Sequence, residues 1–306
     1  MYTSRRSFLK KTAFAAAGAT MLSSELFAAA KKKNVIFGLQ LYSVRDDMQK
    51  DAAGTLKKLA DMGYKYVEHA SYGNRKFYKT YTAADFKKLL DDLGLVMRSG
   101  HTGMGARHWD AAKNDFTDIW KYTVDDAAVC GQKFVISPSI DKSWYKDMDT
   151  LKKSMDIFNK SGELCKKSGM KFGYHNHNFE FSTQIDGKQL YELILQYTDP
   201  KLVAQQMDIG NMYGAGGRAL DILKAHPGRF ELMHVKDEIK TTKGEMEEPY
   251  ESTILGKGII GTKAIVDLAL KSGGTTDFII EQESYQSLTP IESSKQDYDI
   301  MKTWGF

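Results

Sequence analysis

Short apolar runs alternate with amphipathic stretches along most of the chain. The runs are rich in β-branched and aromatic residues, as buried strands are, whereas the longer stretches repeat apolar residues at helical spacing. This order predicts parallel strands joined by crossover helices. Eight runs predict strands, at Val35 to Tyr42, Tyr66 to His69, Val96 to Gly100, Phe134 to Ser137, Lys171 to His175, Val203 to Asp208, Phe230 to His234 and Phe278 to Glu281. Seven stretches between them predict helices, at Thr55 to Met62, Ala83 to Leu93, Asp115 to Cys130, Leu151 to Ser168, Leu190 to Tyr197, Ala219 to His226 and Lys263 to Ser272.

Local signals mark where several of these helices begin and end. Four predicted helices are followed by a glycine, at Gly63, Gly94, Gly131 and Gly169. Glycine adopts the left-handed conformation without a side-chain penalty, so it ends a helix before the next strand. A final helix is expected to begin with Thr289 as its cap and Pro290 as its first residue.

Eight strand and helix units predict an α/β fold, a closed (β/α)8 TIM barrel. An open doubly wound sheet is the alternative. Its glycine-rich phosphate fingerprint is missing after the first strand, where Leu41-Tyr42-Ser43-Val44-Arg45 stands instead. The longest irregular stretch, residues 238–258, follows the seventh strand and is a candidate mobile flap over the barrel mouth.

The first thirty residues are expected to be a targeting segment, which leaves residues 31–306 as the barrel domain. Ser4-Arg5-Arg6-Ser7-Phe8-Leu9-Lys10 precedes an uncharged stretch and a small-residue exit near Ala30. This order resembles a twin-arginine export signal, so we expect a periplasmic protein. The uncharged stretch is too short to span a bilayer, so no stable membrane insertion is expected after cleavage.

Charge and cysteine content narrow the range of partners. Without residues 1–30, the formal net charge of +4 falls to +1. A nearly neutral domain offers no electrostatic basis for binding nucleic acid. Cys130 and Cys165 indicate two buried thiols or one bridge, not a disulfide framework. The sequence is compatible with an oligomer and does not fix the oligomeric state.

Polar residues gather where the predicted strands end. A TIM barrel builds its active site from the carboxyl ends of its strands, so these side chains should converge on the mouth. A divalent ion needs several carboxylate and imidazole donors around one point. The residues concerned are Glu68, His69, His101, His175, His177, Glu180, Asp208, His234, Lys236, Asp237, Glu281 and Glu283.

Four segments in order give the chain a recognisable pattern. They are Gly173-Tyr174-His175-Asn176-His177-Asn178-Phe179-Glu180-Phe181, Gln206-Met207-Asp208-Ile209-Gly210-Asn211, His234-Val235-Lys236-Asp237 and Ile280-Glu281-Gln282-Glu283. Together they resemble the sugar phosphate isomerase/epimerase superfamily, the xylose-isomerase-like TIM barrels, over residues 34–306.

The resemblance implies a divalent metal ion, Mn²⁺, Mg²⁺, Zn²⁺ or Co²⁺. Ketose epimerases of this group hold the ion with a glutamate, an aspartate, a histidine and a glutamate from strands five to eight. Asp208, His234 and Glu281 match the last three positions, whereas His175 stands at the first. The implied ligands here are therefore His175, Asp208, His234 and Glu281. Since the two glutamates exchange protons with substrate carbon in those epimerases, His175 argues against an unmodified two-glutamate mechanism.

The remaining candidates are assigned to catalysis or substrate binding. We expect Glu281, His175 and His177 to act as acid or base, and Lys236 to bind a substrate oxygen or stabilise an enolate. The residues expected to contact substrate are Glu68, His101, Glu180 and Trp109.

The predicted activity is a metal-dependent isomerase or epimerase that takes a proton next to the carbonyl of a sugar or sugar derivative. The alternatives are a lyase or hydrolase acting on 3-keto-glycosides or inosose, and a non-catalytic carbohydrate-binding barrel. An apurinic-site endonuclease is disfavoured, because such enzymes need further histidines after positions equivalent to Asp208 and His234. Here Ile209-Gly210-Asn211 and Val235-Lys236-Asp237 follow.

Overall fold

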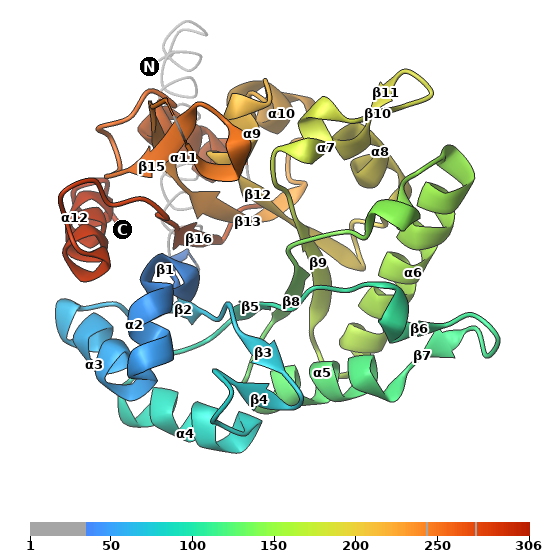
Figure 1. The fold of residues 1–306 in the computed structure, drawn as a ribbon, viewed down its shortest axis with the longest axis horizontal. Helices are drawn as coiled ribbons and strands as arrows, with labels where there is room; N and C mark the ends of the chain where they lie inside the picture. Colours follow the sequence, from blue (N-terminus) through green and yellow to red (C-terminus); the bar gives the residue numbers. More distant parts are fainter. Residues whose placement is uncertain (1–34, 243, 273) are drawn as a thin grey trace, which may run out of the picture. The chain divides into compact units, whose positions relative to one another are not determined.

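The computed structural model describes residues 35–242, 244–272 and 274–306. The predicted export segment, residues 1–30, lies outside them. Figure 1 shows the barrel strands at the centre and the helices as a ring around them. The barrel strands are β1 (Ile36–Gln40), β2 (Val67–Glu68), β5 (Ser99–His101), β8 (Phe134–Ser137), β9 (Lys171–His175), β12 (Val203–Asp208), β13 (Phe230–Val235) and β16 (Asp277–Ile280).

All eight predicted strands are confirmed, and their pairing makes a barrel. The order in the sheet is β2-β1-β16-β13-β12-β9-β8-β5, and every pair is parallel. Parallel bridges from Tyr66 to Val96 and from His69 to Gly100 join β2 to β5, the two ends of this order. The doubly wound alternative is thereby excluded, because an open sheet leaves its two edge strands unpaired.

The predicted helices are present within a few residues of their expected bounds. Gly63, Gly94, Gly131 and Gly169 all have positive φ, of 108°, 66°, 79° and 73°. A capping box of Thr289 with Glu292 opens the last helix. The helices are α3 (Ala52–Met62), α4 (Ala83–Asp92), α5 (Asp118–Val129), α6 (Met148–Lys167), α8 (Leu190–Tyr197), α10 (Ala219–Ala225), α11 (Thr262–Ser272) and α12 (Pro290–Thr303).

Additional elements follow the carboxyl ends of several strands and were not predicted. Short helical segments are η1 (Leu41–Val44), α2 (Arg45–Lys50), η2 (Ala106–His108), η3 (Lys142–Trp144), α7 (Phe179–Ser182) and α9 (Asn211–Gly214). Antiparallel hairpins are formed by β3 (Tyr72–Gly73) with β4 (Lys76–Phe77), β6 (Trp109–Asp110) with β7 (Asp115–Phe116), β10 (Gln184–Ile185) with β11 (Lys188–Gln189), and β14 (Asp237–Lys240) with β15 (Tyr250–Thr253).

The predicted flap, residues 238–258, is therefore a hairpin for much of its length. Its two strands are joined by a segment that contains η4 (Glu245–Glu247). Met246 of that segment borders the cavity at the barrel mouth. The location of the flap over the mouth is confirmed, and its mobility stays a prediction.

Two apolar regions hold the fold together. The barrel interior is filled by Tyr66, Phe134, Ile136, Ala204, Leu232 and Ile279. A larger cluster lies between the sheet and helices α5, α6 and α8, and includes Trp120, Phe158 and Phe172. Cys130 and Cys165 are both buried free thiols, as one of the two sequence alternatives predicted.

Within the part of the chain that the structure describes, no helix combines the length and apolar character needed to cross a membrane.

Candidate metal centre

The cavity at the mouth of the barrel has a volume of about 620 Å³. It opens over the carboxyl ends of the strands, where β5 ends on His101, β9 ends on His175, and β16 is followed by Glu281. These three side chains border the cavity together with His177 and Glu283. The arrangement follows from parallel strands, whose carboxyl ends all meet on one side of the barrel.

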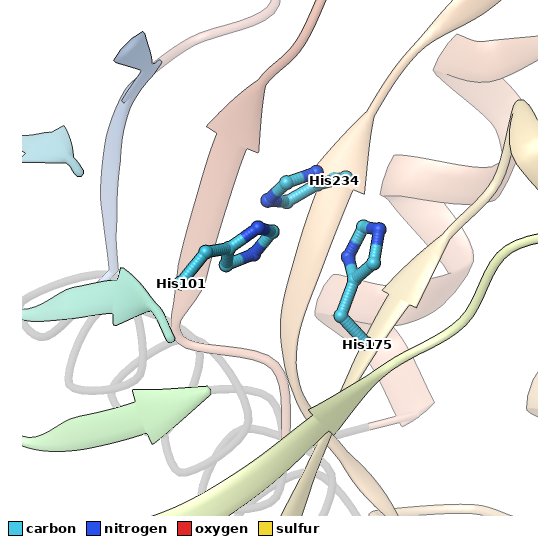
Figure 2. A group of neighbouring side chains, drawn as sticks. All are labelled: His101, His175 and His234. Carbon is cyan, nitrogen blue, oxygen red and sulfur yellow. The ribbon is translucent and has the colours of Figure 1, made fainter. Parts of the chain in front are cut away.

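Four side chains bring potential metal donors to one point. One ligand atom each of His175, Asp208, His234 and Glu281 lies within 4.8 Å of the others, and all four residues are buried. They come from four strands that are neighbours in the barrel, β9, β12, β13 and β16. His101 joins His175 and His234 in an overlapping group, and Figure 2 shows these three imidazoles turned toward one another.

Asp208 fits a cation better than it fits its protein surroundings. Its Oδ1 accepts hydrogen bonds from the backbone amides of Gly210 at 2.9 Å and Asn211 at 2.8 Å. Its Oδ2 is buried without a hydrogen-bond partner among the described residues and lies 3.6 Å from His234 Nδ1, beyond hydrogen-bond length. A buried carboxylate oxygen with no donor is costly unless a cation satisfies it. The donor set therefore fits a divalent metal ion.

His234 lies between three carboxylates. Its Nε2 is 2.6 Å from Glu68 Oε1, and its Nδ1 is 3.1 Å from Glu281 Oε2 and faces Asp208. Burial alone would lower the pKa of His234, but the negative charges of Glu281 and Glu68 raise it well above its ordinary value. A positive charge at this point is thus strongly favoured.

Two neighbouring imidazoles, His175 and His177, have pKa values shifted in the opposite direction. Burial lowers the pKa of His175 well below its ordinary value, and the nearby His234 and His101 lower it further. Burial also lowers the pKa of His177, to about 4. Neutral imidazole is the form in which histidine binds a metal.

Glu281 differs from Asp208 in its access to the cavity. It borders the cavity, whereas Asp208 is completely buried. Burial raises the pKa of Glu281 to about 7, although His234 opposes that shift. Of the two carboxylates in the donor set, Glu281 is the one that a bound molecule can reach.

The structure corrects two of the predicted substrate contacts on acidic residues. Glu68 has no exposed surface, and its oxygens accept hydrogen bonds from protein side chains beneath the cavity. Glu180 is also fully buried, and accepts from the Tyr174 hydroxyl at 2.5 Å and the His177 amide at 3.0 Å. Both carboxylates are engaged by protein donors, and neither borders the cavity.

Lys236 and Trp109 are corrected for similar reasons. The Lys236 ammonium is completely buried and lies 2.5 Å from Glu283, 3.0 Å from Asn211 and 3.1 Å from Glu245. Three acceptors leave this side chain no donor for a substrate oxygen, so the predicted catalytic role is replaced by a structural one. Trp109 packs edge-on against Phe116 in the β6–β7 hairpin and does not border the cavity.

Sequence reasoning assigned no role to two residues of the site. Gln206 Oε1 accepts hydrogen bonds from both His101 and His175, and Asn176 bonds the backbone of Asp208 through both its amide atoms. Glu283, which the sequence predicted among the polar residues at the mouth, borders the cavity. A signal for Gln206 was available, because it lies two residues before Asp208 and so shares its side of the strand.

The chain resembles known proteins over most of its length. A family model described as xylose isomerase-like TIM barrel matches residues 56–304. A crystal structure of a sugar phosphate isomerase/epimerase from Parabacteroides distasonis superposes with a TM-score of 0.75 at 26% identity, covering 88% of this chain and 94% of that one.

The comparisons include a curated relative and a further solved structure. An inosose dehydratase from Bacillus cereus is 27% identical over 140 residues, 42% of this chain and 46% of that protein. The chain thus spans less than half the length of the curated relatives it matches. The crystal structure of the IOLI protein with a zinc atom has a TM-score of 0.66 at 14% identity, covering 88% of this chain and 97% of that one, and shares the fold.

Proposed function

The chain belongs to the family of xylose isomerase-like TIM barrels, and from this premise we propose that it is a metal-dependent enzyme that removes a proton next to the carbonyl group of a sugar derivative. One observation carries the proposal. Two imidazoles and two carboxylates from four neighbouring strands converge where a cavity opens to the barrel mouth. The name of the zinc-containing neighbour is compatible with a divalent ion at such a site.

The ion would be held by His175, Asp208, His234 and Glu281. Two imidazole donors favour Zn²⁺ or Co²⁺ over Mn²⁺ and Mg²⁺, which are better suited to oxygen ligands. When bound, such an ion supplies Lewis acidity, which polarises a carbonyl and the neighbouring hydroxyl of a substrate. Around it, His101 and His177 border the cavity and are placed to orient substrate hydroxyl groups.

Glu281 is the base in this proposal. It borders the cavity, whereas Asp208 is buried with one oxygen engaged by two backbone amides. A carboxylate next to the polarised carbonyl can accept the proton of the carbon between the carbonyl and the next oxygen.

Elimination suits this site better than epimerisation. Epimerisation by two residues needs a second proton-transfer group on the opposite face of the substrate. At the fifth-strand position, where the ketose epimerases have a glutamate, this chain has His175, whose Nδ1 faces Gln206 Oε1 at 3.0 Å while its other nitrogen is left for the ion. In a β-elimination Glu281 takes the carbon-bound proton, the C–H electrons form the double bond, and the β-oxygen leaves with a proton that Glu281 returns. One carboxyl group is sufficient for both transfers.

The comparisons support this choice in part. Inosose dehydratases, the curated relatives, carry a lyase name, whereas the more extensive structural match carries an isomerase/epimerase name. We therefore propose a lyase acting on a keto-cyclitol or a 3-keto-glycoside, with isomerisation or epimerisation of a keto sugar as the second candidate.

The test is turnover in deuterated water. The protein, loaded with Zn²⁺ or Co²⁺, is offered inosose, a 3-keto-glycoside and free ketoses, and products are followed by NMR and mass spectrometry. A lyase releases water or the aglycone, whereas an epimerase returns an isomer that carries deuterium. Binding without turnover or exchange would instead favour a carbohydrate-binding barrel.

Glu281→Gln tests whether Glu281 is the base. This variant keeps an oxygen donor but loses basicity, so with metal bound its rate should fall by about 10²–10⁴. Glu163→Gln, on the outer surface of α6, should keep the wild-type rate. Equal solvent exchange by Glu281→Gln and the wild type would remove Glu281 as the base.

A further inference from the structure

A buried polar network lies directly beneath the donor set. Its centre is Glu68 at the end of β2 and Gln206 on β12, both with no exposed surface. Gln40 and Ser99, equally buried, complete it. Buried polar groups of this kind are costly unless each donor meets an acceptor, so their hydrogen-bond directions can be worked out.

Glu68 fixes the first direction. Its carboxylate lies 2.7 Å from Gln40 Nε2, 2.8 Å from Gln206 Nε2 and 2.6 Å from His234 Nε2, and the Ser99 hydroxyl also donates to it. An ionised carboxylate only accepts, and its two oxygens can take four donors. Hence His234 carries a proton on Nε2.

The direction of the Gln206 amide follows from this. Since its nitrogen must face the Glu68 carboxylate, its oxygen faces His101 Nε2 at 2.7 Å and His175 Nδ1 at 3.0 Å. An amide oxygen accepts from both, so each of these two imidazole nitrogens carries a proton. A neutral imidazole protonated on one nitrogen offers a lone pair only on the other.

We propose that Glu68 and Gln206 are positioning residues that select the tautomers of three histidines, so that His234 presents Nδ1 and His175 presents Nε2 to a single metal ion. The same network keeps His101 Nε2 away from the ion and leaves its Nδ1 to accept a hydrogen bond from substrate. This inference rests on the metal site of the proposed function and is independent of the reaction performed there.

The geometry also argues against a second ion at the overlapping group of His101, His175 and His234. His234 Nδ1 faces Asp208 and Glu281, so a second ion would need its Nε2. That nitrogen already donates to Glu68 at 2.6 Å. A second ion would therefore have to displace a proton held between a buried carboxylate and its partner.

The experiment combines zinc binding with nitrogen NMR of ¹⁵N-histidine-labelled protein. In the zinc-loaded wild type, we expect one ion per chain, with the proton of His234 on Nε2 and that of His175 on Nδ1. Substitution of a residue that hydrogen-bonds a metal ligand typically weakens metal binding by about 10–100-fold, and this loss is expected for Gln206→Leu and Glu68→Gln. Their histidine signals should show mixed tautomers.

Gln205→Leu is the matched control. Gln205 is the neighbouring residue on the same strand and is equally buried, but its side chain faces the other side of the strand, where its amide donates to Thr198 Oγ1 at 3.5 Å. Gln205→Leu also removes a buried amide, so it shows what that loss does by itself, and it should keep wild-type zinc affinity and tautomers.

Two results would overturn the inference. One is two zinc ions per chain with His101 among the ligands. The other is wild-type affinity and tautomers in Gln206→Leu. If that variant does not fold, the nitrogen NMR spectrum of the zinc-loaded wild type tests the proposal by itself. Protons on His234 Nδ1 and His175 Nε2 would contradict it. Normal zinc binding and tautomers without turnover of any keto sugar would count against the proposed reaction alone.

Discussion

One atom, Asp208 Oδ2, distinguishes the metal centre from an ordinary buried ion pair. It has no hydrogen-bond partner among the described residues and faces His234, whereas its sister oxygen is anchored by two backbone amides. Asp208→Asn should keep the anchor and place an NH₂ group where the metal donor was. We expect zinc binding to weaken by more than the ~10–100-fold that is typical when a residue hydrogen-bonded to a metal ligand is replaced. The fold should be retained. Calorimetric titration and circular dichroism measure both. Unchanged zinc affinity would exclude Asp208 as a ligand.

A second residue, Asp297 on α12, links pH to stability. Its Oδ1 accepts from the Leu255 amide at 2.9 Å, its Oδ2 has no partner among the described residues, and burial raises its pKa from 3.8 to about 7. Folding raises the pKa of this carboxyl, so its protonated form stabilises the fold fully when the pH is below the pKa of the unfolded chain. This contribution is lost as the pH rises through the pKa of the folded protein. The shift corresponds to about 4 kcal/mol between pH 4 and pH 8.

Asp297→Asn removes this pH dependence. The free energy of unfolding of the variant, relative to that of the wild type, should therefore increase by about 4 kcal/mol between pH 4 and pH 8. Urea unfolding of the metal-free proteins at the two pH values measures the difference. A constant difference across the range would mean that Asp297 is ionised in the fold.

At the scale of elements, the β14–β15 hairpin is tied to the barrel by a buried lysine. Lys236 lies beside the start of the hairpin and contacts Glu245 of η4 and Glu283 beyond β16. At the base of the hairpin, Asp237 accepts hydrogen bonds from the backbone amides of Gly256 and Gly258, which follow β15. These contacts of the buried Lys236 ammonium hold the segment that places Met246 at the border of the cavity.

Lys236→Met should loosen this hairpin. Removing one partner of a fully buried ion pair typically costs about 3–5 kcal/mol, and the cost here should lie below that range because Glu245 and Glu283 keep some contact with water. We expect this loss in urea unfolding, together with faster hydrogen exchange over residues 237–253. Lys240→Met, in the same hairpin but exposed, should change neither quantity. Wild-type exchange in Lys236→Met would show that the hairpin is held by other contacts.

At the scale of the whole molecule, barrel closure depends on close approach of its first strands. A Cβ on Gly38 of β1 would lie 2.4 Å from the backbone oxygen and 2.7 Å from the ring of Tyr66, beside β2. Backbone cannot give way as a flexible side chain does. Gly38→Ala should cost at least about 1–3 kcal/mol, whereas Gly73→Ala, with nothing within 4 Å, should be nearly neutral. Equal stability of the two variants in urea would contradict the packing argument.

Export is also a property of the whole molecule, and it stays a prediction because it depends on residues outside the described structure. Replacing Arg5 and Arg6 with lysine should leave the precursor in the cytoplasm if the twin-arginine route is used. Cell fractionation with an antibody against the barrel measures the distribution. An unchanged periplasmic yield would exclude this route.

The sequence by itself determined the strands, the helices and the barrel, because their signals are local. An apolar run predicts a strand, and a glycine such as Gly63 or Gly169 predicts the end of a helix. Each signal depends on only a few neighbouring residues. It also located the candidate donors, since parallel strands bring their carboxyl ends together whatever their exact register. Among those candidates, the resemblance to the xylose-isomerase-like barrels singled out His175, Asp208, His234 and Glu281 before their distances were known.

Only the tertiary structure decided which polar residues face the cavity and which face one another. Glu68 and His234 are 166 residues apart, and their contact depends on the register of strands across the barrel. The same applies to Lys236, whose partners come from a hairpin and from beyond β16. The pattern of residues along a strand predicts which face of the sheet a side chain lies on. It does not predict which side chain from another strand it will contact. For this reason the sequence assigned Glu68, Glu180 and Lys236 to substrate and overlooked Gln206, which the assembled barrel places between three histidines and a carboxylate.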